Sequence, residues 1–154
     1  MAGSIDARLA ELGIELPKPS TPAANYIPYV VTGKLVFISG QVSASGGTRI
    51  TGKVGGDLSV EQGQEAARLC ALNLLAHLRD ACGGDLGKVA RCVTLSGFVN
   101  CPPTFGEMPK VINGASDLMV AVFGDAGRHA RFAVGAPNLP FDAAVEVAAV
   151  FELA

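Results

Sequence analysis

The sequence has little of what binding to nucleic acids or metals requires. Its 154 residues include no tryptophan, two tyrosines and two histidines, and 12 Lys and Arg stand against 14 Asp and Glu, for a net charge of −2. Nucleic-acid binders usually present a basic face with stacking aromatic residues, so no nucleic-acid partner is expected. The histidines, His77 and His129, lack the spacing of a metal site, and neither a metal nor another cofactor is expected.

Long apolar runs and a secretory leader are also missing. No run reaches the length of about 18 apolar residues that a membrane span needs. Residues 1–13 carry acidic side chains and no apolar core segment, which is not the pattern of a secretory signal. The cysteines form no CxxC pair and are expected to be free, buried thiols of a cytoplasmic protein. They are Cys70, Cys82, Cys92 and Cys101.

What the sequence has in quantity is apolar residues. Hydrophobic residues make up 49% of the chain and charged residues only 17%, which excludes a disordered chain. A chain of this length fits one domain with a core of its own. We expect an N-terminal helix and proline-rich arm in residues 1–23, followed by a single domain in 24–154. The small charged fraction suggests that some surface is buried against another subunit.

The pattern of apolar residues predicts an α/β (α+β) fold, in which two helices cover one face of a mixed sheet of five to six strands. The expected elements are a short helix (5–12), a strand hairpin (26–31 and 34–39), a short strand (48–51), a long helix (59–82), a strand (89–99), a second helix (109–123) and two final strands (130–136 and 143–153).

Two capping-box patterns mark the starts of the two longer helices. Ser59 is followed three residues later by Gln62, and Thr104 is followed three residues later by Glu107. In such a box the side chain of each residue accepts a hydrogen bond from the backbone amide of the other. The sequence therefore predicts a helix start at each position.

The last strand, AAVEVAAVF, is apolar on both of its faces. A strand with two apolar faces needs cover on both sides of its sheet. Two helices can cover only one side, so the other is expected to lie against a second copy of the chain in a symmetric homo-oligomer.

Two charged residues interrupt these final apolar strands. Arg131 lies within HARFAVG and Glu146 within AAVEVAAVF. An unpaired charge in such surroundings is unfavourable by several kcal/mol, on the order of the effective desolvation penalty of an ion. Two interpretations remain open on these grounds: a structural Arg131–Glu146 pair or charges at a subunit edge, and a ligand site in which the guanidinium binds a carboxylate or phosphate.

Two motifs resemble those of the reactive intermediate deaminase family, also called Rid or YjgF and formerly labelled L-PSP endoribonucleases. They are KLVFISGQ (34–41) and GRHARFAVGAPNLPFDAAVEV (127–147), and the similarity extends over residues 24–152. The residues that fit the later motif without gaps are Ala130, Arg131, Val134, Leu139, Pro140 and Glu146. The N-terminal helix and the segment 97–118 indicate a branch distinct from the best-known deaminases.

The resemblance implies a chorismate-mutase-like homotrimer with ligand sites in the clefts between subunits. It also implies cofactor-free hydrolysis of small 2-imino or enamine carboxylic acids, similar to 2-iminobutanoate or 2-iminopropanoate. Arg131 would hold the substrate carboxylate and Glu146 would place the water that attacks the imine carbon, after which ammonia leaves.

The resemblance implies further substrate-binding residues. Tyr26 matches the family's cleft tyrosine, with Tyr29 as the competing candidate, and Ser39 matches a cleft serine. Asn100 lies near a ligand-binding asparagine across a one-residue gap. Each also has an ordinary interpretation, as a surface or interface aromatic, a turn-capping hydroxyl and a strand-end residue respectively.

The sequence departs from the family at the two positions after Arg131. Ala133 occupies a cleft position where many members carry cysteine, and Phe132 stands where the deaminases have a small polar residue. A regular strand would direct Phe132 to the face opposite Arg131, where it could pack in the core.

Other functions use some of the same features. A non-catalytic trimer that binds a small carboxylate metabolite would need Arg131 as much as the enzyme does. Endoribonuclease activity follows the family's older label, but the net negative charge disfavours it. A purely structural or chaperone-like role has only the small charged fraction in its favour.

Overall fold

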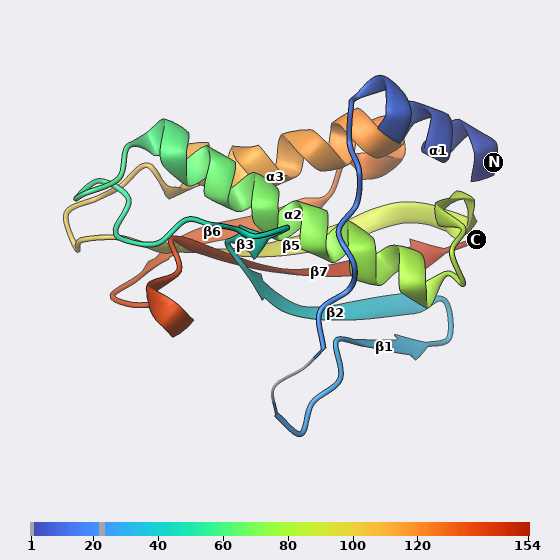
Figure 1. Cartoon of the computed structure of the whole chain (residues 1–154), viewed down its shortest axis with the longest axis horizontal. Coiled ribbons are helices and arrows are strands. Elements are labelled where there is room, and N and C mark those ends of the chain that lie inside the picture. The colour runs from blue at the N-terminus through green and yellow to red at the C-terminus, as the bar shows by residue number, and fades with distance from the viewer. Residues whose placement is uncertain (1, 22–23) are drawn as a thin grey trace.

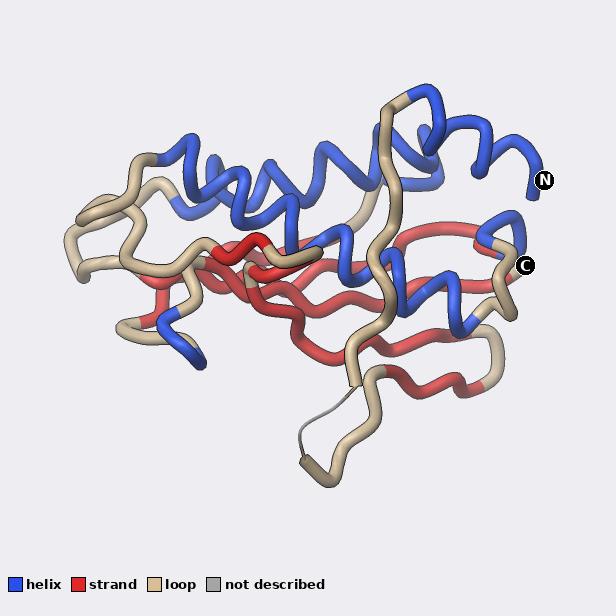
Figure 2. Tube along the Cα trace, in the orientation of Figure 1, coloured by secondary structure: helices blue, strands red, loops and turns tan. Residues whose placement is uncertain are grey.

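The computed structural model describes residues 2–21 and 24–154, and it has a layer of helices over one face of a sheet (Figures 1 and 2). The helices are α1 (Ala2–Glu11), α2 (Val60–Ala81) and α3 (Met108–Phe123). The strands are β1 (Tyr29–Thr32), β2 (Leu35–Val42), β3 (Ala44–Ser45), β4 (Thr48–Arg49), β5 (Val89–Asn100), β6 (Ala130–Ala136) and β7 (Val145–Leu153). Three 3-10 turns are η1 (Leu86–Lys88), η2 (Gly124–Gly127) and η3 (Pro140–Asp142).

The main sheet has five strands in the order β1-β2-β7-β5-β6. Its only parallel pair is β5 with β6, and β6 forms one edge. The mixed sheet predicted from the sequence is therefore confirmed with five strands, and the small β3–β4 ladder stands apart from it. β7 lies in the middle of the sheet, and one of its two apolar parities lies on the face away from the helices.

The helix starts agree with one predicted capping box and contradict the other. At α2, the Ser59 side chain accepts from the Gln62 amide and the Gln62 side chain accepts from the Ser59 amide. At α3, the N-cap residue is Glu107, without a side-chain cap. The box predicted at Thr104 is wrong because the Phe105 amide donates to the Pro102 carbonyl, which keeps Thr104 inside a turn.

Both long helices lie on the same face of the sheet, as predicted, and no helix in residues 2–21 and 24–154 covers the opposite face (Figure 1). The covered face and the helices form the core, with β7 residues such as Val145, Val147 and Phe151 fully buried. Large apolar side chains are exposed on the uncovered face, namely Val30, Phe37, Phe132 and Val134. An exposed apolar face of this kind supports the homo-oligomer, which stays a prediction.

None of the helices in the described ranges 2–21 and 24–154 is long and apolar enough to cross a membrane.

The two long helices approach each other closely at Gly114. A Cβ placed there would lie 2.1 Å from the Gln64 carbonyl oxygen, and this neighbour is backbone that cannot rotate away. The α2–α3 packing therefore depends on the missing side chain.

We expect Gly114→Ala to lower the free energy of unfolding by about 1–3 kcal/mol, because overpacking exceeds the gain in helix propensity. Gly106→Ala is the matched control, since nothing lies within 4 Å of its Cβ position. Urea denaturation followed by circular dichroism measures both variants. Equal stabilities for the two would contradict the close approach.

Candidate functional site

Arg131 points toward the helix layer from the edge strand β6. Its Nη1 donates to Ser116 Oγ at 3.1 Å, and its Nη2 donates to the Pro109 carbonyl at 3.3 Å, so α3 supplies both acceptors. Its Cα partner on β5 is Leu95, which is fully buried beneath the helices. Arg131 as a residue is only partly buried. Arg131 therefore braces α3 against the sheet edge while remaining accessible to a ligand.

Ser116 links Arg131 to a histidine. Ser116 Oγ lies 2.9 Å from His129 Nε2, and His129 Nδ1 lies 2.6 Å from the Gly127 carbonyl oxygen. A carbonyl only accepts, so Nδ1 is the donor in that contact. The Ser116 hydroxyl can then donate to Nε2 while accepting from Arg131. This chain of three contacts fixes the direction of the guanidinium.

Glu146 points to the opposite, uncovered face of the sheet. Its strand neighbours Val145 and Val147 are fully buried in the core, so the intervening side chain points away from it. The structure therefore contradicts a structural Arg131–Glu146 pair within one chain. The reason is that side chains alternate between the two faces of a pleated sheet. The Arg131 side chain lies on the face that the helices cover, and the Glu146 side chain lies on the opposite face.

Glu146 borders a cavity of about 200 Å³. A Cβ at Gly40 would lie 2.2 Å from Glu146 Oε2, so a larger residue at that position would displace the carboxylate. The register between β2 and β7 shifts between Ile38 and Gln41, which places an irregularity of β2 directly beside the carboxylate. Burial raises the pKa of Glu146 above its ordinary value. Among the described residues, no lysine or arginine forms an ion pair with it.

Tyr26 lines the same cavity as Glu146 and is 53% exposed. The competing tyrosine, Tyr29, donates its hydroxyl to Asp80 at 2.8 Å and is engaged elsewhere. Ser39 lies one residue before Gly40, and its Oγ donates to the Ile27 carbonyl at 2.9 Å. Ser39 thus anchors the loop that carries Tyr26 from within strand β2, and it is not the turn-capping hydroxyl of its ordinary interpretation.

Asn100 is fully buried, and its side-chain amide is fully used within the chain. Its Nδ2 donates to Asp142 Oδ1 and to the Ala143 carbonyl, both at 3.1 Å, and its Oδ1 accepts from Lys53 Nζ at 2.8 Å. The Lys53 ammonium also donates to the Pro137 carbonyl. The observed contacts are those of a structural hub at the end of β5.

Ala133 and Phe132 lie on opposite faces of β6. Ala133 packs against the core on the same face as Arg131. Phe132 is 45% exposed on the other face and meets Phe98 edge to face, with ring centroids 5.5 Å apart. The predicted direction of Phe132 is confirmed, but its expected packing in the core is wrong because the helices cover only the Arg131 face.

The predicted residues therefore separate into two groups. Glu146 and Tyr26 share the cavity on the uncovered face, whereas Arg131 and Ala133 lie on the helix side of the edge strand. Ser116, His129, Gly40 and Phe141 were not among the predicted site residues. Gly40 lies inside the matched motif of residues 34–41, and His129 and Phe141 lie inside that of residues 127–147, whereas Ser116 lies outside both.

The four cysteines are free and buried, as predicted. Burial raises the pKa of Cys92 to about 12 and also raises the pKa of Cys70, Cys82 and Cys101. Within the part of the chain that the structure describes, no three His, Cys, Asp or Glu residues are grouped so as to hold a metal ion.

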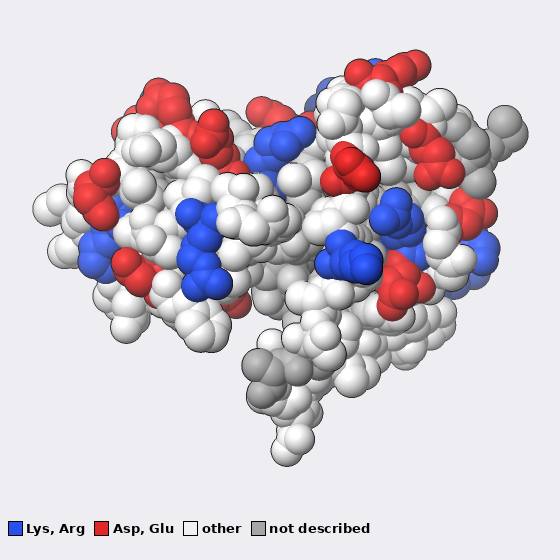
Figure 3. Space-filling model, viewed as in Figure 1, with Lys and Arg blue, Asp and Glu red and all other residues white. Residues whose placement is uncertain are grey.

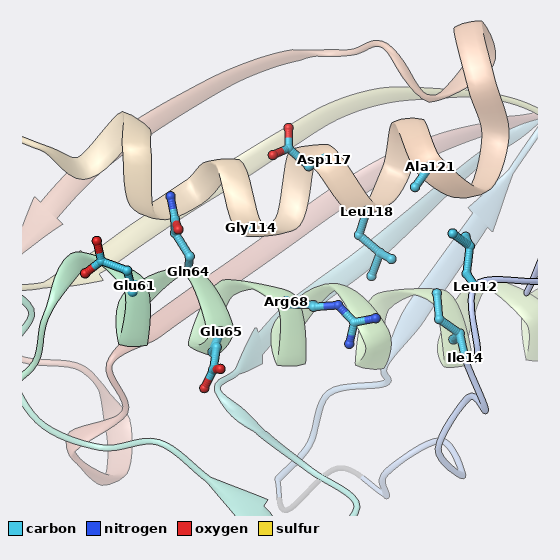
Figure 4. Close-up of a pocket in the computed structure, with 10 residues that line it drawn as sticks. All are labelled: Leu12, Ile14, Glu61, Gln64, Glu65, Arg68, Gly114, Asp117, Leu118 and Ala121. Atoms are coloured by element: carbon cyan, nitrogen blue, oxygen red, sulfur yellow. The ribbon is translucent and has the colours of Figure 1, made fainter.

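A separate groove of about 550 Å³ lies between α2 and α3 on the outer side of the helix layer. Figure 4 shows that Arg68 points along this groove, whereas Gln64 turns toward α3, where its Nε2 donates to the Lys110 carbonyl at 2.9 Å. None of the predicted site residues lines it. The groove is therefore unrelated to the sites of Arg131 and Glu146.

The profile of the family described as "YjgF/chorismate mutase-like, putative endoribonuclease" matches residues 6–153. Protein TCP17 of Trypanosoma cruzi is 49% identical over 154 residues, which cover 99% of this chain and 96% of that protein. The crystal structure of Atu1372 from Agrobacterium tumefaciens is 46% identical, with a TM-score of 0.92 and 99% and 94% of the two chains covered. E. coli TdcF with bound serine shares the fold at 23% identity, with a TM-score of 0.62 and 91% and 97% covered.

The contacts of Asn100 give a test of its role. We expect Asn100→Ala to lower the free energy of unfolding by about 2–3 kcal/mol, because the Lys53 ammonium and the Ala143 carbonyl each lose a hydrogen bond to Asn100. Asn113→Ala, at a partly buried helix position, should stay within about 0.5 kcal/mol of the wild type. Urea denaturation compares the two. Unchanged stability of Asn100→Ala would contradict the structural hub and favour a ligand contact.

Proposed function

The chain belongs to the YjgF/chorismate-mutase-like family, and on that premise we propose that it hydrolyses small 2-imino or enamine carboxylic acids in clefts between subunits of a homotrimer. Arg131 of one subunit holds the substrate carboxylate, and Glu146 of the neighbouring subunit places the attacking water. The observation that carries the proposal is the position of these two partly buried charges on opposite faces of one sheet.

Two features of the molecule support a site shared between chains. Arg131 lies on the edge strand β6, where its guanidinium can extend past the sheet. Glu146 lies beside a cavity on the uncovered apolar face, which a second copy would cover. When an edge of one copy meets the open face of the next around a closed ring, every cleft receives one Arg131 and one Glu146.

The chemistry needs few groups. Water attacks the imine carbon as the Glu146 carboxylate takes one of its protons, a C–O bond forms, and the π electrons move to nitrogen, which receives that proton from Glu146 to give a neutral carbinolamine. Glu146 then takes the hydroxyl proton and passes it to the nitrogen as the C=O bond forms and the C–N bond breaks. Ammonia leaves, the 2-oxo acid remains, and the carboxylate is regenerated. The raised pKa of Glu146 suits both roles, because the best proton-transfer group has a pKa near the working pH.

The nature of the ligand is supported by one fold relative. TdcF from E. coli has been crystallised with serine, a small molecule with a carboxylate. A guanidinium binds a carboxylate through two parallel hydrogen bonds, and Arg131 already directs two donors at oxygen atoms. A substrate carboxylate would replace Ser116 and Pro109 as acceptors.

A second candidate is carboxylate binding without turnover. It is favoured by the hydrogen bonds from Arg131 to α3. A ligand that replaces Ser116 and Pro109 as acceptors would remove these bonds and so change the contact between Arg131 and the helix. Glu146→Gln separates the two functions: the enzyme loses its rate and keeps its binding, whereas a pure binder has no rate to lose.

Endoribonuclease activity, which the family description also names, has less support. Acidic and basic side chains are intermixed on the face seen in Figure 3, and the net charge is −2. Binding along an RNA backbone depends on a continuous basic surface. Cleavage of RNA that depends on Arg131 would support this function instead.

The shared cleft predicts complementation between two inactive variants. Arg131→Ala and Glu146→Gln should each lower kcat/KM for 2-iminobutanoate by about 100-fold or more, since each removes a charged contact to the reacting complex. The whole trimer population from equal coexpression should recover about a quarter of the wild-type rate, the fraction of clefts that draw Arg131 from a Glu146→Gln chain and Glu146 from an Arg131→Ala chain. Ammonia release measures the rate.

Homotrimers of each variant alone give the background rate of ammonia release. No recovery in mixed trimers of confirmed mass would contradict a cleft shared between chains. Wild-type activity of Arg131→Ala on its own would contradict the mechanism.

The raised pKa of Glu146 predicts the pH profile. The base is active when ionised, so kcat/KM should fall as the pH drops through the raised pKa, at a pH above the ordinary glutamate value of about 4.3. Rates between pH 4 and pH 8 define this limb. The limb should be absent from the residual activity of Glu146→Gln, and an unchanged limb there would assign the base to another group.

A further inference from the structure

The turn between β6 and β7 has an unusual backbone. Phe141 has φ 58° and Asp142 has φ 55°, and these are the two non-glycine residues with positive φ in the described ranges. A bulky residue in this region is an outlier that costs free energy. It persists only where the surrounding structure imposes the conformation, and such residues gather at functional sites.

Contacts on both sides of the turn impose this conformation. Asn100 Nδ2 holds Asp142 Oδ1 and the Ala143 carbonyl, and the Gly52 amide donates to the Asp142 carbonyl at 2.9 Å. The Lys53 ammonium fixes the preceding segment through the Pro137 carbonyl. The hub around Asn100 therefore sets the direction of the Phe141 side chain.

The imposed direction brings Phe141 to the cavity of Glu146. Phe141 is 78% exposed, which makes it the most exposed of the large apolar residues in the described part of the chain. Phe141 lines the 200 Å³ cavity together with Glu146 and Tyr26. It also borders a neighbouring cavity of about 130 Å³ between Val42 and Ala143. An exposed ring held by a strained turn beside a carboxylate is suited to contact a ligand's apolar part.

We propose that Phe141 is a specificity-determining residue of the Glu146 cavity, and that it selects 2-imino acids with an apolar side chain larger than a methyl group. This inference rests on the proposed function, since it names the substrate class of the same site. The Phe141 ring and the apolar border of the adjoining cavity receive the substrate side chain. The polar end of the same substrate lies toward Glu146.

The test compares two substrates that differ only in the side chain. An amino acid oxidase generates the 2-imino acids of alanine and leucine in situ, and their hydrolysis is followed by competition with semicarbazide. Phe141→Ala should lower kcat/KM for the leucine-derived imine by about tenfold or more and leave the alanine-derived imine within about threefold, because the lost contacts involve only the larger side chain. Phe141→Leu should restore much of the preference.

Phe37→Ala is the matched control. Phe37 is 45% exposed on the same uncovered face but does not line the cavity, so its substitution should not alter the ratio between the two substrates. Equal losses for both substrates in Phe141→Ala, or a change in the mass of the oligomer alone, would identify Phe141 as an interface residue and overturn the inference.

A binding measurement separates this inference from the proposed function. Calorimetry with 4-methyl-2-oxopentanoate and 2-oxopropanoate, the corresponding products, should show that Phe141→Ala weakens only the larger acid. If the wild type hydrolyses neither imine but this selective loss occurs, the proposed reaction fails and the assignment of Phe141 holds. If both acids bind equally to the wild type and to Phe141→Ala, the assignment is wrong whatever the enzyme does.

Discussion

Successive side chains of a strand point to opposite faces of a pleated sheet, and this alternation determines what a single chain can do. Arg131 aligns with the buried residues beneath α3, and Glu146 lies between two residues that point into that same core. The two charges therefore cannot meet around one small ligand within a chain. In the proposed mechanism each is half of a site, and the uncovered apolar face is the surface on which a second copy would complete it.

Different contacts hold Arg131 and Glu146 in place. Arg131 is directed by hydrogen bonds to α3, with Ser116 linked in turn to His129. Glu146 is accommodated by Gly40 at the irregular part of β2. A hub of side chains around Asn100 fixes the turn that carries Phe141. Contacts outside Arg131 and Glu146 thus hold both side chains in place, and the proposed mechanism requires such preorganisation.

Local patterns predicted the fold well, and contacts between distant segments limited the prediction of the site. The Ser59 box was correct because its two residues are three apart on one helix. The similar pattern at Thr104 was wrong, since a turn to Pro102 competes for the same backbone. Neither the opposite directions of Arg131 and Glu146 nor the Ser116–His129 contact could be read from the sequence, because both depend on strand register and on how α3 meets β6.

The proposed mechanism requires one small carboxylic acid to be bound by two chains. The most direct measurement is a crystal structure of the assembled protein with 2-oxobutanoate, the product of the proposed reaction. We expect a trimer in which the ligand carboxylate lies on Arg131 of one chain and the ligand carbonyl lies near Glu146 of the next. A ligand bound by residues of one chain alone, with Arg131 still bonded to Ser116 and Pro109, would contradict it.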